Sequence, residues 1–148
     1  MAWKPEFSVR LLTTLSQEEA CHRLRISLKE QDLDIMEEVD LAARVRNRTG
    51  LSFGEYTILT VWSPLTAYHA LLAIPEAGAF IPFHLVVCSY RGKTLISYVS
   101  PEWLAEAIDR IEFRLMANEI STKLERAVSA LDVAEPTCRE PELRPVRQ

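Results

Sequence analysis

The sequence lacks a surplus of positive charge. Its 148 residues include 17 Lys and Arg against 21 Asp and Glu, which gives a formal net charge of -4 at pH 7. Such a chain has no general attraction for phosphate backbones, so nucleic acid is not an expected partner. With 48% apolar and 26% charged residues, the composition is that of an ordinary globular protein of one domain.

Cysteines are few and have no partner nearby in the sequence. Cys21, Cys88 and Cys138 are an odd number, widely spaced, which excludes a disulfide framework and a zinc knuckle. Free thiols are typical of a reducing compartment. The first residues also lack an apolar stretch of signal-peptide length, so the sequence predicts a cytoplasmic protein.

Long apolar runs are missing as well. The one uncharged run, Tyr56 to Pro75, is interrupted by Pro64 and contains several polar residues, so no membrane is expected as a partner. This run lies in the segment 54–101, which we expect to supply the core. The charged residues of that segment are Glu55, Glu76, Arg91 and Lys93.

Glycine is absent from two turns where specific functions require it. The turn Thr13–Ser16 after the first predicted strand has none, which argues against a doubly wound nucleotide-binding fold. Ser63 stands between Trp62 and Pro64, whereas the nucleophile elbow of a hydrolase needs small neighbours and a backbone N–H after the serine. We therefore expect the Ser63 hydroxyl to cap a helix.

Local patterns predict a series of alternating strands and helices. Alternation over 7–11 indicates a first strand, Ser16 with Glu19 begins a helix as in a capping box, and Asp40 caps a helix over 41–48. The remaining predicted elements are strands around 33–39, 55–61, 85–90 and 94–99 and helices over 64–75 and 101–131. This order predicts an α+β domain, with a largely antiparallel sheet of about five strands and helices packed on one face.

The C-terminal part is predicted to contain a long helix and a tail. Residues 1–131 are expected to form the single domain, and 132–148 a disordered tail, because prolines and charges dominate there. The apolar stripe of the helix over 101–131 changes phase between Leu115 and Ile120. Either the second half projects and pairs with another chain, or the whole helix packs on its own domain.

Four segments, in this order and spacing, resemble the domain-of-unknown-function 302 family. The segments are Leu33–Asp40, Tyr56–Leu59, Ser63–Tyr68 and Phe80–Pro82 leading into Leu85–Val87. With the first strand and helix, the family-like part covers about 7–101. The resemblance implies a small α+β domain similar to a single copy of the TATA-binding-protein-like fold, often a homodimer, with no established reaction.

The chain departs from the family pattern at two cysteines. Family members often have Cys-Asn-Pro where this chain has Trp62-Ser63-Pro64, and Leu-Pro-Cys where it has Ile81-Pro82-Phe83. If the family thiols serve redox or metal chemistry, this chain has lost it. Cys88, which strand alternation predicts to be buried, is not an obvious replacement.

The titratable residues form no clear catalytic or metal-binding pattern. His69 follows Pro64 on a predicted helix and is a candidate general base, but no acid or second histidine stands three or four residues away. His84 shares a strand face with Cys88, yet a metal site needs a third ligand. We therefore expect no metal and no cofactor.

Arginines and acids are interleaved in the first third of the chain. We expect them to form a solvated, partly paired surface rather than an anion-binding patch. The residues are Arg23, Arg25, Arg44, Arg46 and Arg48, with Glu37, Glu38 and Asp40 close by.

The favoured function is a dimeric module that binds a small ligand or another protein. Its site is expected near the turn before Pro64 and the apolar loop 76–82, because apolar loops beside a sheet often cover ligands. The candidate ligand-binding residues are Trp62, Pro64, Tyr68, Phe80, Pro82 and His84. The alternative is an enzyme acting on a small molecule, with His69 and Ser63 as its catalytic candidates. The expected partner is a second copy of the chain.

Overall fold

The elements of the computed structural model alternate along the chain as predicted. It describes residues 6–131 and 135–136. The strands are β1 (Ser8–Thr13), β2 (Asp34–Asp40), β3 (Tyr56–Trp62), β4 (Phe83–Tyr90), β5 (Lys93–Val99) and β6 (Glu135–Pro136). The helices are α1 (Gln17–Glu30), α2 (Leu41–Thr49), α3 (Pro64–Ala73), the 3-10 helix η1 (Pro75–Ala79), α4 (Pro101–Ile108) and α5 (Ile111–Ser129). Within this described part, no helix is both long and apolar enough to cross a bilayer.

The strands form one antiparallel sheet in the order β2-β3-β4-β5-β1-β6. The predicted hairpin joins β4 to β5 through Arg91 and Gly92, both at positive φ (49° and 76°). A two-residue turn of this kind matches the twist of the flanking strands. The predicted α+β class, with a largely antiparallel sheet of about five strands, is confirmed, and the two-residue β6 adds a sixth strand.

The helix boundaries follow local sequence signals. The Ser16 hydroxyl accepts the Glu19 N–H at 3.1 Å and begins α1. Asp40 Oδ1 accepts the Ala43 N–H at 2.9 Å and begins α2, which ends at Gly50 in the left-handed region. These caps satisfy backbone groups that a helix end leaves unpaired, as the sequence predicts.

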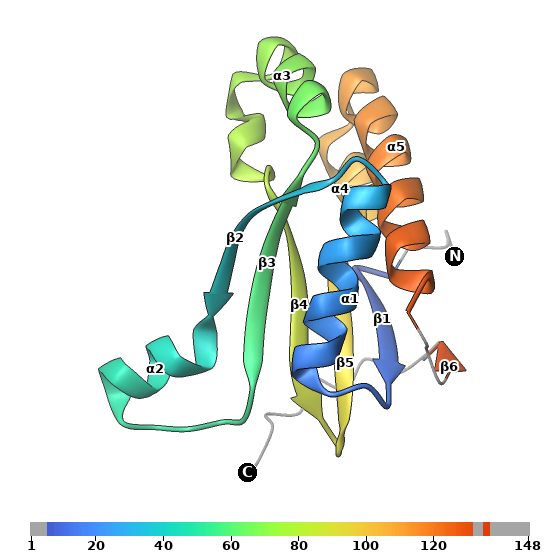
Figure 1. Ribbon diagram of the computed structural model, residues 1–148. Helices are drawn as coiled ribbons and strands as arrows, with labels where there is room; N and C mark the ends of the chain where they lie inside the picture. The colour runs from blue at the N-terminus through green and yellow to red at the C-terminus, as the bar shows by residue number, and fades with distance from the viewer. Residues whose placement is uncertain (1–5, 132–134, 137–148) are drawn as a thin grey trace, which may run out of the picture.

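The core lies between the sheet and a helical layer. α1 crosses the middle strands, with α5 beside it (Figure 1). The largest fully buried side chains include Leu24 and Leu28 of α1, Phe113 and Leu124 of α5, Leu59 and Val61 of β3, Leu85 and Val87 of β4, and Ile96 of β5. The segment 54–101 supplies three core strands, as expected, but α3 within it is largely exposed on its outer side.

The predicted helix over 101–131 is two helices. Asp109 adopts the left-handed conformation (φ 49°) and ends α4 before α5 begins. In α5, Ile120 and Leu124 are 2% and 1% exposed, whereas Ile111 and Leu115 are 63% and 65% exposed. The hypothesis that the second half projects to pair with another chain is therefore wrong, because that half packs on its own domain.

The predicted tail over 132–148 lies outside the described residues except at one point. Glu135–Pro136 form β6, which pairs with Leu11 and Leu12 of β1. These two residues therefore belong to the sheet.

Candidate functional site

The two catalytic candidates have different environments. His69 is exposed on α3 and meets the Tyr68 ring edge to face, with centroids 5.5 Å apart. Ser63 is buried at the N-cap position of α3, but its hydroxyl donates to Thr66 Oγ1 at 3.1 Å and makes no cap hydrogen bond. The prediction that this hydroxyl caps the helix is wrong. In the described part of the chain, Ser63 and His69 form no hydrogen-bonded pair.

The six ligand-binding candidates are dispersed. Pro64 and Tyr68 are exposed on α3, and His84 is exposed on β4 opposite Thr60. Trp62 is half-buried at the end of β3, opposite Asp34. The half-buried ring of Phe80 packs edge to face on Phe113 at 5.9 Å, and half-buried Pro82 follows a cis peptide bond. The structure therefore places these candidates in several locations.

The described cysteines are buried free thiols. Burial raises the pKa of both Cys21 and Cys88, which keeps them protonated at neutral pH. A protonated, buried thiol is a poor nucleophile and a poor metal ligand. Within residues 6–131 and 135–136, no cluster of three His, Cys, Asp or Glu side chains is arranged to hold a metal ion.

Helix α3 has an apolar surface on the side that faces solvent. It contains no charged residue, and its buried side chains are Ala67 and Ala70. On the opposite side, Leu65, Tyr68 and Leu72 are 69%, 59% and 67% exposed. Their spacing of three and four residues places them on one helical face. A helix on a protein surface normally carries polar residues on its solvent-exposed face. The solvent-exposed face of α3 is apolar instead.

The first half of α5 also exposes apolar side chains. α3 lies beside that part of α5 (Figure 1), and Thr66 Oγ1 donates to Glu119 Oε1 at 3.2 Å. Leu115 and Ile111 lie one and two turns before Glu119 on the same side of α5, and both are exposed. We call Leu65, Tyr68, Leu72, Ile111 and Leu115 the end patch.

The end patch is large for a chain of this size. At roughly 100 Å² each, its five side chains expose about 500 Å² of mostly apolar surface, which is at the upper end of what monomeric proteins present. Exposed patches of that size commonly mark a site of association.

A groove of about 690 Å³ lies beside β2. Its lining residues are Arg25, Lys29, Leu33, Asp34, Ile35, Met36, Glu37, Glu38 and Trp62. Five of these are consecutive, 34–38, and consecutive strand residues point to opposite faces of a sheet. A groove that touches all five therefore runs along the edge of β2 rather than over one face.

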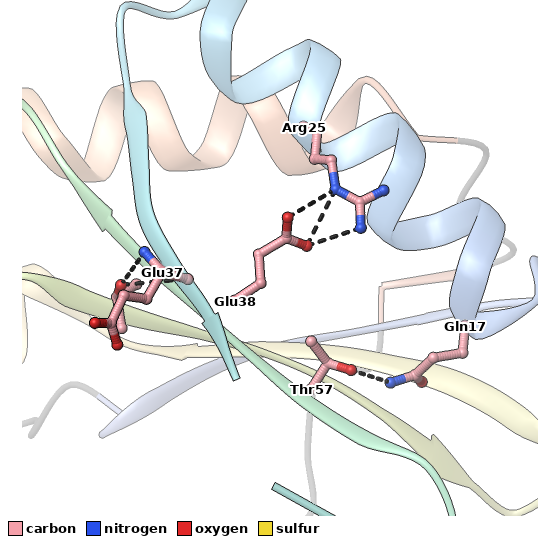
Figure 2. Close-up of polar contacts among 6 residues, drawn as sticks. Gln17, Arg25, Glu37, Glu38 and Thr57 are labelled. Carbon is pink, nitrogen blue, oxygen red and sulfur yellow. Dashed lines mark hydrogen bonds and ion pairs between the residues drawn. The ribbon is translucent and has the colours of Figure 1, made fainter. Parts of the chain in front are cut away.

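Polar contacts hold α1 against this part of the sheet (Figure 2). Arg25 Nη2 and Nε both donate to Glu38, with the shortest N···O distance 2.8 Å. Within the sheet itself, the Glu37 N–H of β2 donates to Thr60 Oγ1 of β3 at 2.8 Å, next to a bulge in β2 between Ile35 and Glu37. The charge of Glu38 is thus balanced by an arginine.

Figure 2 also shows a contact that holds the start of α1 against the sheet. Gln17 Nε2 donates to Thr57 Oγ1 at 3.2 Å and to the Val87 carbonyl at 2.6 Å. Its Oε1 is buried without a hydrogen-bond partner among the described residues. Gln17 thereby fixes the position of α1, and with it Arg25, relative to β3 and β4.

Comparison with known proteins gives a family and a similar solved structure. The family model described as "Domain of unknown function DUF302" matches residues 8–131, which extends past the predicted limit near residue 101 and includes α4 and α5. No curated protein matches the chain. The crystal structure of an uncharacterized conserved DUF302 protein from Bacillus stearothermophilus is similar, with a TM-score of 0.78 and 24% identity over 84% of this chain and 98% of that one. At this identity, the similarity concerns the fold.

Proposed function

This chain belongs to the DUF302 family, a domain of unknown function, and from that premise we propose that it is a protein-binding module that assembles as a homodimer through the end patch. The observation that supports this proposal is the apolar outer face of α3. The helix buries alanines and exposes two leucines and a tyrosine. Covering those side chains removes apolar surface from water, which stabilises the dimer by roughly 25 cal/mol for each Å² buried.

A second copy of the chain is the partner that this surface fits best. In a two-fold dimer each surface meets itself, so an interface without charged residues avoids repulsion between like charges. No charged residue lies in α3, and the charged residues of α5 next to the end patch are paired within the chain, among them Glu119 with Lys123 at 3.1 Å. Exposed Pro64, His69 and Leu71 beside it bring the surface closer to the about 800 Å² that each partner buries in a standard interface.

An enzyme with a site near Trp62 to His69 has less support. Catalysis by a serine and a histidine needs the two side chains within hydrogen-bond reach. Ser63 is buried and bonded to Thr66, whereas His69 is exposed beside Tyr68. The end patch contains Tyr68 and adjoins Pro64, so two of the predicted binding residues have a role in the proposed interface.

The proposal is tested with the double variant Leu65→Glu and Leu72→Glu. Both positions are exposed, so the monomer is expected to keep its fold. In the dimer, the two new carboxylates of each chain would meet those of the other and destabilise the interface. The matched control is Ile26→Glu, which adds a carboxylate at an exposed apolar position on α1, away from the end patch. Light scattering after size-exclusion chromatography gives the mass, and circular dichroism verifies the fold.

We expect the native chain and the Ile26→Glu control to have the mass of a dimer. The double variant should have the mass of a monomer with an unchanged spectrum. A double variant that stays dimeric would move the interface away from α3, and a native chain that is monomeric throughout would refute the dimer.

A further inference from the structure

We propose that the free edge of β2 binds an extended basic segment of a partner protein as an added strand. β2 is the last strand on its side of the described sheet and pairs only with β3. A strand at an edge presents unpaired backbone N–H and C=O groups, which an extended peptide can pair with. The groove of about 690 Å³ lies along this edge, where such a segment would sit.

The two sides of this edge differ in charge. Asp34 is opposite Trp62 and Glu37 is opposite Thr60, so both acids point away from the buried side of β3. Within the part of the chain that the structure describes, neither carboxylate forms an ion pair or a side-chain hydrogen bond. The side chains on this side of the edge are therefore acidic and available to a partner.

On the side facing α1, which also carries Asp40 opposite Thr57, basic residues balance the acids. Glu38 is opposite buried Leu59 and is balanced by Arg25 of α1. Lys29 also lines the groove from α1 and adds a positive charge. An added strand points alternate side chains to the two sides. The segment that fits therefore alternates Lys or Arg, facing the acids, with apolar residues facing α1.

A second copy of β2 does not fit this edge. Pairing two β2 strands would place their acids opposite one another, which is destabilising. Those acids are Asp34, Glu37, Glu38 and Asp40. Charges and bulges on an edge strand commonly prevent association of identical edges. The same acids attract a cationic strand, which is why the partner here differs from the one proposed for the end patch.

The test uses the full chain and a fluorescein-labelled peptide of alternating Lys and Val, measured by fluorescence anisotropy at low salt. Two comparison peptides are needed: one of alternating Glu and Val, and one with the lysines and valines in separate blocks. We expect the alternating basic peptide to bind at least about tenfold more tightly than either, because only it satisfies both sides of the edge. Equal binding by the block peptide would show that the affinity depends on net charge alone, which would overturn the proposal.

Variants of the protein locate the binding. The pair Asp34→Asn and Glu37→Gln should weaken binding about tenfold, since it removes both unpaired carboxylates. The control pair Glu106→Gln and Glu125→Gln changes the net charge equally at exposed positions on α4 and α5 and should leave binding unchanged.

Hydrogen exchange provides the structural readout. Bound peptide should slow the exchange of backbone amides in β2, residues 34–40, while protection confined to other elements would contradict the proposal. The monomeric Leu65→Glu, Leu72→Glu variant should bind the peptide as the native chain does. This comparison separates a failure of the dimer proposal from a failure of the peptide-binding proposal.

Discussion

Helices α1 and α3 pack on the same domain but are built in opposite ways. α1 buries Leu24 and Leu28 and exposes charged residues, among them the Glu19–Arg23 pair at 2.8 Å. α3 buries alanines and exposes leucines and a tyrosine. The large apolar side chains of α1 thus stabilise the fold of this chain, whereas those of α3 are exposed, as the proposed interface requires.

The largest expected contrast comes from shortening one leucine in each helix. Leu24→Ala, on the buried side of α1, should lower the free energy of unfolding by about 3 kcal/mol, because it removes buried methyl groups and leaves a cavity. Leu72→Ala, on the exposed side of α3, should change it by less than about 0.5 kcal/mol in the monomer. Urea unfolding at low protein concentration measures both. Similar losses at the two positions would show that α3 is covered within its own chain.

A smaller contrast is expected between the serines that precede the two helices. Ser16→Ala should cost about 1 kcal/mol, because the hydroxyl accepts the Glu19 N–H as an N-cap. Ser63→Ala should cost about 0.5 kcal/mol, since among the described residues its hydroxyl bonds the Thr66 hydroxyl and not a helix N–H. Thermal unfolding followed by circular dichroism compares the two. A larger loss for Ser63 would mean that its hydroxyl supports more than the start of α3.

The smallest expected effect concerns two exposed ion pairs of α1. Arg25→Gln breaks the link from α1 to Glu38 of β2 and should cost about 0.5 kcal/mol, and less at high salt. Arg23→Gln breaks the pair with Glu19 inside α1 and should cost less than Arg25→Gln does. Urea unfolding at low and high salt separates them. An Arg25 loss that does not change with salt would show that packing of its alkyl chain, not charge, joins α1 to β2.

Local signals in the sequence predicted most of the fold. Ser16, Asp40 and Gly50 begin or end helices because capping depends on the side chain and backbone of a few neighbouring residues. The β4–β5 hairpin follows from Arg91 and Gly92 in the same way. The break at Asp109 was missed, because no glycine or proline marks it and the apolar spacing continues across it.

The candidate site was less accessible to prediction. The uncharged stretch around α3 was expected to lie in the core, since periodicity places Leu65 and Leu72 on one face but does not show whether the same chain covers that face. The groove beside β2 arises where α1 meets the strand that follows it, and the sequence does not show that this strand lies at the edge of the sheet. Trp62 was a candidate and does line that groove, but its neighbours Arg25 and Lys29 come from α1 and became visible only in the fold.

Sedimentation equilibrium of the native protein over a wide range of concentration tests whether the apolar outer face of α3 is an interface between two copies of this chain. We expect the average mass to rise to twice that of the monomer as concentration increases, and the Leu65→Glu, Leu72→Glu variant to stay at the monomer mass. A native chain that sediments as a monomer at every concentration would contradict this expectation.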